Sequence, residues 1–538
     1  MQPTSIPKKA LIIYSVLILV FLFLFLLSFQ LSIFYPIYGD ESDWKLISSR
    51  FLLDQKKLVY FFPACLNSFV LEAPISWYPG RLLDSLIYEG AHDNAKLRIV
   101  GIVQYIFLIT IFWQIAYLRT NLGMLRSFLF VLAFLSIGVL PVLLIFNRPE
   151  QPLLVYLSLC IYLAVLNSHK PNRLLANQVF VTVVFCLLAN LMIAAHPKGI
   201  YLLPIVLIAF RKLVKSPRYL LILLGVMCWT SVETIQLWNA RTTCVASPWL
   251  ETTLRAMTLN IGSLFSEPTA FLLQVIKNCV RFYSYLNEIF FHSTYQSQWL
   301  PSLELSTYKQ FALRFLNALC WMVLTTIFVY LGLKLRKTKL AAGRMFESFA
   351  FAIVMCLALI TVMQIGKNFY ESALILPLLL LLCIFLINGQ DGKGINFITQ
   401  IALPALLVVG ALSSYTRYAL WEDYLPQWRA AAIAPSINHD LVADFAKDQC
   451  GIGDKARKLI LDSSTYTTFW HHPLPVFSGY LFGWYATGTD YKSTIAGLNP
   501  DGLVAMCDEL PAGLLSLSKK NGGMCCMSRS NLERLTQK

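Results

Sequence analysis

The sequence predicts an all-α polytopic membrane protein of about eleven transmembrane helices, with a small α/β domain at its C-terminal end. Of its 538 residues, 57% are hydrophobic and only 14% are charged, whereas a soluble domain carries about 25% charged residues. Apolar runs close to the spanning length of about 20 residues recur along most of the chain. These observations exclude a soluble globular protein, because too few polar side chains are present to cover its surface.

The first apolar run predicts an uncleaved signal anchor. It begins after Lys8 and Lys9 and extends from Ala10 to about Tyr35, which is longer than the apolar core of a cleaved signal peptide. No small-residue cleavage site follows it. The two lysines before the run place the N-terminus in the cytoplasm.

Basic residues are concentrated in alternate loops. Six segments predicted to be cytoplasmic hold 16 Lys and Arg residues against the single acid Asp391, whereas the outer segment 36–98 has eight acids and seven bases. This asymmetry follows the positive-inside rule, so the net charge of +15 reflects topology and predicts no nucleic-acid partner. The six segments are 1–10, 119–126, 168–177, 211–218, 333–345 and 389–396.

The predicted spans divide the chain into two parts. Eleven spans starting from a cytoplasmic N-terminus place the C-terminus outside. The transmembrane module covers residues 1–414, with outer loops at 36–96 and 240–311, and a periplasmic domain covers 415–538. The spans are 10–35, 97–118, 124–146, 152–167, 178–195, 199–210, 219–239, 312–333, 346–365, 372–388 and 397–414.

The C-terminal domain is predicted to be mixed α/β, because short apolar runs such as 458–461 and 502–506 alternate with turn residues. Its even set of cysteines predicts disulfides in an oxidising compartment, with a connectivity that the sequence leaves open. They are Cys450, Cys507, Cys525 and Cys526. No Asn-x-Ser/Thr sequon occurs in the chain, which favours a protein of the bacterial inner membrane with this domain in the periplasm.

Three carboxylates stand directly outside the first span. Asp40, Glu41 and Asp43 precede Trp44 at the membrane surface, and the loop that follows is too long to be a mere connection. Acidic and aromatic side chains together at an interface suit the binding of a sugar or another polar headgroup. A solvated start of the loop is the alternative and stays open.

A cation also occurs in each of three short outer turns. Arg148, Lys198 and Lys367 lie on the membrane face where topology disfavours cations. Together with Arg81 they are expected to surround an anionic group, and a lipid phosphate is the obvious candidate. Interfacial snorkelling explains any one of them and stays open. The turns are 147–150, 196–199 and 366–371.

These motifs resemble those of the GT-C glycosyltransferases, integral membrane enzymes that use polyprenyl-phosphate sugars. That group includes the protein O-mannosyltransferases, the aminoarabinose transferase of lipid A and the O-antigen glucosyltransferases. The shared features are a loop that opens with Asp40 and Glu41, an Arg-Pro-Glu turn at 148–150 and a His-Pro-Lys-Gly turn at 196–199. The Pro-Gly-Arg stretch at 79–81 is closer to the O-antigen-modifying enzymes. The resemblance is best over the first six spans and fades in the C-terminal domain.

The resemblance implies an inverting glycosyl transfer. Asp40 would be the general base that takes the proton from the acceptor hydroxyl, and Glu41 would orient the acceptor or Asp40. Fixed cations would stabilise the charge that develops on the leaving phosphate. These are Arg81, Lys198 and Lys367, with Arg148 and His196 behind them. The residues expected to bind the acceptor or the sugar are Asp43, Trp44, Tyr370 and Glu371.

The implied donor is an undecaprenyl-phosphate sugar, and the implied acceptor is a cell-surface glycan or lipid such as lipopolysaccharide O-antigen. The lipid bilayer surrounds the spans, and a flippase partner would present the donor outside. No cofactor or metal is assigned, although some members of the group use a divalent metal, which Asp40, Glu41 and Asp43 could hold. An O-antigen polymerase or ligase, a lipid-linked-sugar flippase or transporter, and an inactive scaffold stay open as rival functions.

Overall fold

The computed structural model falls into two compact units. Unit 1 consists of Met1–Ile33, Gly101–Cys228 and Leu259–Leu425, and unit 2 of Phe34–Val100, Trp229–Thr258 and Pro426–Lys538. Each is considered by itself. The residues that the structure describes are 8–35, 41, 57–59, 70–88, 94–171, 173–242, 259, 263–286, 289–291, 306–337, 344–363, 372–387, 396–426, 428–429, 439–453, 455–456, 458–462, 465–469, 474–477 and 490–536.

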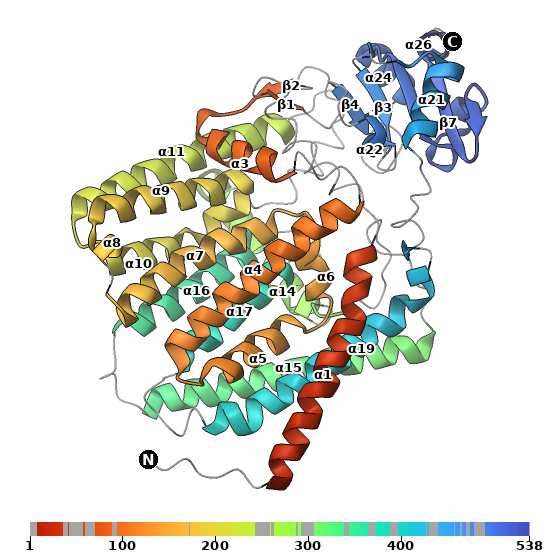
Figure 1. Ribbon diagram of the computed structural model, residues 1–538. Helices are drawn as coiled ribbons and strands as arrows, with labels where there is room; N and C mark the ends of the chain where they lie inside the picture. The colour runs from red at the N-terminus through yellow and green to blue at the C-terminus, as the bar shows by residue number, and fades with distance from the viewer. Residues whose placement is uncertain are drawn as a thin grey trace. The chain divides into compact units, whose positions relative to one another are not determined.

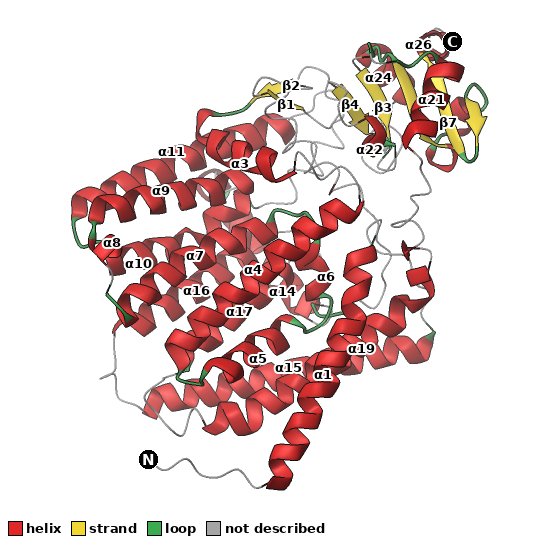
Figure 2. Ribbon diagram, viewed as in Figure 1, coloured by secondary structure: helices red, strands yellow, loops and turns green. Residues whose placement is uncertain are grey.

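Unit 1 contains helices and no strand within its described residues (Figures 1 and 2). α10 packs against α7 and α16, α16 against α17, and α19 against α5. The helices that lie wholly or partly in this unit are α1 (Lys8–Phe34), α4 (Asn94–Thr120), α5 (Met124–Leu135), α6 (Leu140–Ile145), α7 (Glu150–His169), α8 (Arg173–Ala176), α9 (Gln178–Ala195), η3 (Pro197–Leu202), α10 (Leu203–Leu213), α11 (Pro217–Thr242), α13 (Ser263–Ser266), α14 (Pro268–Leu286), α15 (Thr307–Lys337), α16 (Arg344–Met363), α17 (Ser372–Leu386), η5 (Ile398–Ala402), α19 (Leu403–Trp421) and η6 (Glu422–Tyr424).

Many of these helices expose apolar side chains. In α1, Ile13 is 69% and Phe23 65% exposed, and in α11 Leu221 is 68% exposed. Water would leave such surfaces prone to association, whereas lipid accommodates them. Seven described helices are long and apolar enough to cross a membrane, which confirms a polytopic membrane protein. They are Ile12–Phe34, Lys96–Thr120, Glu150–His169, Gln178–Ala195, Pro217–Asn239, Thr307–Leu333 and Ile398–Tyr424.

Three further apolar helices are shorter: Met124–Leu135, Ser348–Met363 and Ser372–Leu386. Every predicted span contains a described helix, but the total of eleven crossings stays a prediction. The predicted span 124–146 consists of two helices, because Gly138 adopts a φ of 61° and turns the chain between them. The last span, predicted to end at residue 414, continues as α19 to Trp421.

The described part of the first outer loop belongs to unit 2. β1 (Lys57–Val59) pairs antiparallel with β2 (Val70–Glu72). A 3-10 turn, η2 (Ile75–Trp77), then leads into α3 (Tyr78–Tyr88). Pro79 stands in the first turn of α3, where the N–H that proline lacks would have no helical partner. The Pro-Gly-Arg motif is therefore the start of a helix.

The C-terminal residues of unit 2 form a five-stranded mixed sheet in the order β4-β3-β5-β7-β6 (Figure 2). β3 is parallel to β4 and β5, whereas β7 is antiparallel to β5 and β6. The predicted α/β pattern is confirmed. The elements are α21 (His439–Cys450), β3 (Lys458–Leu461), α22 (Tyr466–Phe469), β4 (Leu474–Phe477), α24 (Tyr491–Leu498), β5 (Gly502–Met506), η8 (Cys507–Glu509), α25 (Ala512–Leu515), β6 (Lys519–Asn521), β7 (Met524–Ser528) and α26 (Arg529–Thr536).

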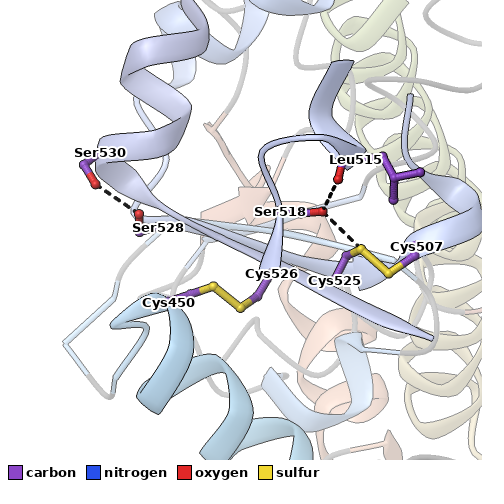
Figure 3. The surroundings of a disulfide bond; sticks show 8 residues. All are labelled: Cys450, Cys507, Leu515, Ser518, Cys525, Cys526, Ser528 and Ser530. Atoms are coloured by element: carbon purple, nitrogen blue, oxygen red, sulfur yellow. Dashed lines mark hydrogen bonds between the residues drawn. A yellow bond between two sulfur atoms is a disulfide. The ribbon is translucent and has the colours of Figure 1, made fainter. Parts of the chain in front are cut away.

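Two disulfides, Cys450–Cys526 and Cys507–Cys525, link strand β7 of this sheet to two neighbouring elements (Figure 3). Cys525 and Cys526 are neighbours on β7, so their side chains point to opposite faces. One bridge holds the end of α21 and the other holds η8, which follows β5. The predicted disulfides are confirmed, and their connectivity is now assigned.

Candidate active site

A buried carboxylate joins two of the outer turns that the sequence predicts to bind an anion. Lys198 Nζ lies 2.7 Å from Glu150 Oε1, and Arg148 Nε lies 3.2 Å from Glu150 Oε2. The three residues are only 8%, 1% and 9% exposed, in the order Lys198, Glu150, Arg148. We call Arg148, Glu150, Lys198 and His196 the Glu150 cluster.

Local backbone geometry presents these side chains. The Arg148 N–H donates to the Phe146 carbonyl at 2.7 Å in the turn between α6 and α7. Glu150 then opens α7, where the helix dipole favours a carboxylate. After α9, His196 Nδ1 accepts a hydrogen bond from the Lys198 N–H at 3.0 Å. A neutral His196 ring therefore carries its proton on Nε2.

The Glu150 cluster carries more positive than negative charge. Arg148 and Lys198 contribute +2 and Glu150 contributes −1, so these three side chains sum to +1 with His196 neutral. Glu150 offsets much of the cost of burying two cations and fixes their positions. Two cations held in place on one carboxylate are preorganised to stabilise a bound or developing anion.

A second buried ion pair lies in unit 2, beside the predicted general base. Arg98 donates from Nη1 to Glu41 Oε1 at 2.5 Å and from Nη2 to Oε2 at 2.6 Å, and its Nε donates to the Tyr35 carbonyl at 2.9 Å. Arg98 and Glu41 are fully buried. The Tyr35 ring lies 4.9 Å from the ring of Trp428, which follows α19. We call Tyr35, Glu41, Arg98 and Trp428 the Arg98 clamp.

The Arg98 clamp fixes the chain on both sides of Asp40. Asp40 lies outside the described residues, and its role stays a prediction. Its neighbour Glu41 has both carboxylate oxygens on the Arg98 guanidinium, a bidentate arrangement that is strong and directional. The same arginine also donates to the Tyr35 carbonyl.

Arg81 is also buried in unit 2, in the first turns of α3. Its Nη1 lies 3.2 Å from Asp84 Oδ2, and its guanidinium lies 5.0 Å over the Trp77 ring. Trp77 Nε1 donates to Thr234 Oγ1 at 2.8 Å, and Glu233 accepts from the Ser76 N–H at 3.1 Å. Arg81 is thus balanced by a carboxylate. Its predicted contact with a phosphate stays a prediction.

The structure brings three of the predicted phosphate ligands together and leaves other predicted residues undescribed. Arg148 and Lys198 both contact Glu150, and His196 accepts a hydrogen bond from the Lys198 N–H. The remaining predicted site residues lie outside the described part of the chain: Asp40, Asp43, Trp44, Lys367, Tyr370 and Glu371.

Sequence reasoning missed three charged residues that organise these clusters. Glu150 belongs to the Arg-Pro-Glu turn, in which sequence alone singles out the arginine, and Arg98 is one of seven basic residues in the segment 36–98. Arg417 in α19 lies within a candidate span and is 1% exposed. An ionisable residue inside an apolar helix is itself a signal of function, and extending the last span past residue 414 would have revealed it.

Glu41 is the one carboxylate of the acidic trio that the structure describes. Glu41, the described member of the acidic trio, has both oxygens on Arg98. Across the described ranges, no group of three or more His, Cys, Asp or Glu residues is placed to hold a metal ion.

No family model and no curated protein matches the chain. Several solved structures do match it. ArnT from Cupriavidus metallidurans bound to undecaprenyl phosphate is 14% identical, with 95% of this chain and 98% of that chain covered at a TM-score of 0.48. An oligosaccharyltransferase from Archaeoglobus fulgidus in complex with zinc and sulfate is 12% identical, with 91% and 68% covered at a TM-score of 0.43.

A second structure of the archaeal enzyme, AglB from Archaeoglobus fulgidus with an inhibitory peptide and a dolichol-phosphate, is 12% identical, with 91% and 69% covered at a TM-score of 0.43. The function proposed below is supported by the side chains of this chain.

Proposed function

We propose that the chain is an inverting membrane glycosyltransferase. It moves a sugar from undecaprenyl phosphate to a cell-surface glycan or lipid, such as lipopolysaccharide O-antigen, on the periplasmic face of the bacterial inner membrane. The observation that carries this proposal is the Glu150 cluster, in which two buried cations share one carboxylate. Two fixed cations beside apolar helices suit a lipid whose headgroup is a phosphate.

The Glu150 cluster supports the departure of the phosphate. As the bond between the sugar carbon one and the phosphate oxygen breaks, its electron pair stays on the phosphate. Lys198 and Arg148 are held in place by Glu150, so no reorganisation is needed to meet that charge. A phosphate is already stable as an anion, and the leaving group therefore needs no general acid.

The Arg98 clamp supports the other half of the reaction. Asp40 takes the proton of the acceptor hydroxyl as its oxygen forms a bond to carbon one, and the phosphate leaves from the opposite face. The configuration at carbon one is thereby inverted. Glu41 is bound on both oxygens by Arg98, so it suits holding the loop rather than removing the proton.

A flippase or transporter is the rival from another class, and the break between α5 and α6 is a feature that transporters often show. In this chain the freed carbonyls of Ser136 and Gly138 accept hydrogen bonds from Arg417. An internal arginine thus takes the position that a coupling ion would need. This favours the enzyme.

The test is transfer of radiolabelled sugar in membranes loaded with undecaprenyl-phosphate glucose, comparing wild type with Asp40→Asn at matched expression. Loss of a positioned base is expected to lower the rate by about 10²–10⁴-fold. Asp423→Asn, an exposed carboxylate after α19, is the matched control and should keep wild-type transfer. Unchanged transfer in Asp40→Asn would remove that residue from the mechanism. If the wild type transferred no sugar from any polyprenyl-phosphate donor, a flippase or a polymerase would be the favoured function.

A further inference from the structure

The short helix α6 connects the Glu150 cluster to the buried Arg417. It comprises Leu140–Ile145, and all six of its residues are buried. It begins directly after the break that follows α5, and its far end leads into the turn that carries Arg148. Any shift of α6 therefore moves Arg148 and Glu150 relative to Lys198, which comes from a different part of the chain.

Arg417 holds the break at the beginning of α6. Its Nη1 donates to the Ser136 carbonyl at 2.7 Å and also to the Gly138 carbonyl. Its Nη2 donates to Ser28 Oγ at 3.1 Å in α1 and to Ser414 Oγ at 2.9 Å. A broken helix at membrane depth needs donors for its freed carbonyls. One guanidinium supplies them and ties the break to two other helices.

Gly101 and Gln151 hold the other end of α6. Gln151 Nε2 donates to the Leu144 carbonyl and, at 2.9 Å, to the Gly101 carbonyl. A Cβ added at Gly101 would lie 1.9 Å from the Ile145 carbonyl oxygen. α4 thus touches the backbone of α6 at a point where no side chain larger than hydrogen fits.

We propose that Gly101 and Arg417 are positioning residues of the Glu150 cluster: they fix α6 at its two ends and thereby set the place of Arg148 and Glu150. This inference rests on the proposed function, in which the cluster receives the donor phosphate. Misplacing a binding group by about 1 Å costs about 10²-fold in rate even when the substitution is far from the chemistry.

Gly101→Ala is the first test. The added methyl group must push α4 and α6 apart by displacing backbone, since the obstructing atom belongs to a main-chain carbonyl. The expected result is a fall of about 10²-fold in kcat/KM for undecaprenyl-phosphate glucose, with a raised donor KM and an unchanged acceptor KM. Gly225→Ala and Gly332→Ala are matched controls, because both glycines are helical and a Cβ there meets nothing within 4 Å.

Arg417 is tested by a graded pair of substitutions. Arg417→Lys keeps the charge but has only one nitrogen to reach both the carbonyls and the serines, whereas Arg417→Gln loses the charge as well. Donor KM is expected to rise in both, and Arg417→Lys is expected to recover part of the transfer lost in Arg417→Gln. A residue needed only for folding would lower the amount of active enzyme and leave the KM of the folded remainder at its wild-type value.

The outcomes separate this inference from the proposed function. If Gly101→Ala and Arg417→Lys both kept the wild-type donor KM, at any yield of folded protein, the positioning role would be overturned. The proposed glycosyltransferase function would not be affected by that result. Should Gly101→Ala fail to fold, the donor KM of Arg417→Lys decides alone. If the wild type neither binds undecaprenyl phosphate nor transfers sugar from it, the proposed function fails first and the positioning of a phosphate site fails with it.

Discussion

Glu150 and Glu41 are both buried carboxylates held by basic side chains, but their contacts differ. Glu150 in unit 1 lies between Lys198 at 2.7 Å and Arg148 at 3.2 Å. Glu41 in unit 2 has both oxygens on the Arg98 guanidinium. The first carboxylate is shared by two cations, and the second is bound by two nitrogens of one cation.

The difference separates binding from positioning. A bidentate pair makes directional contacts that hold the backbone on either side. A cluster in which two cations share one carboxylate is preorganised for an anion. These contacts support the proposal that the Glu150 cluster binds the phosphate and that the Arg98 clamp holds the chain at Tyr35 and Glu41.

The largest expected effect comes from breaking the neutral pair. Arg98→Met leaves the Glu41 charge buried without its partner, and such a loss costs about 3–5 kcal/mol of unfolding free energy. The double variant Arg98→Met/Glu41→Met removes both charges and should be more stable than Arg98→Met alone. Thermal unfolding of the full chain in detergent measures both. If Arg98→Met were as stable as the double variant, the result would contradict the claim that Arg98 stabilises the buried charge of Glu41.

The next effect sharpens the contrast on the cationic side. Lys198→Met removes one of the two cations of the Glu150 cluster, leaving Arg148 and Glu150 to sum to zero. Transfer is expected to fall by about 10²–10³-fold, with a raised donor KM. Lys447→Met, at an exposed position of α21, controls for the loss of a lysine. Equal donor KM in both variants would argue against phosphate binding at Lys198.

A smaller effect distinguishes the two carboxylates directly. Glu150→Gln raises the charge of its cluster from +1 to +2, so the donor should bind more tightly while release of the lipid phosphate slows. A change of about tenfold in donor KM corresponds to 1.4 kcal/mol. Glu41→Gln should lower kcat and stability and leave the donor KM unchanged. Identical effects of Glu150→Gln and Glu41→Gln on donor KM would contradict the assignment of different roles to the two carboxylates.

The smallest effect concerns the aromatic side of the Arg98 clamp. Trp428→Ala removes the ring that lies 4.9 Å from Tyr35, and such ring pairs contribute about 0.5–1.5 kcal/mol beyond their buried area. The expected result is a fall in kcat of up to about tenfold without a change in donor KM. Steady-state transfer assays with varied donor give both constants. A raised donor KM with normal kcat would place Trp428 with the phosphate site instead.

Much of the architecture could be predicted because the membrane makes strong demands on sequence. Apolar length identified the helices, and even cysteine number identified the disulfides of the C-terminal domain. The break between α5 and α6 was missed because Ser136 and Gly138 are uncharged and too few to interrupt the apolar run around them. Only the left-handed Gly138 and the distant Arg417 reveal it, and neither can be read from local hydropathy.

The candidate site was predicted in part for a similar reason. Topology placed the turns of Arg148 and Lys198 on one membrane face, and the structure joins them. Sequence could not foresee that Glu150 would bind both cations, because that contact spans 48 residues. The sequence also could not show that Arg98 would bind the Glu41 carboxylate, because the pairing of distant charges depends on how the helices pack.

The most direct test of the account is equilibrium binding of undecaprenyl phosphate to the full chain in lipid nanodiscs, comparing wild type with Lys198→Met and Glu41→Gln. We predict that Lys198→Met weakens binding by about 10²-fold or more, whereas Glu41→Gln keeps wild-type affinity in its folded fraction. Equal affinity of wild type and Lys198→Met would contradict the assignment of the lipid phosphate to the Glu150 cluster.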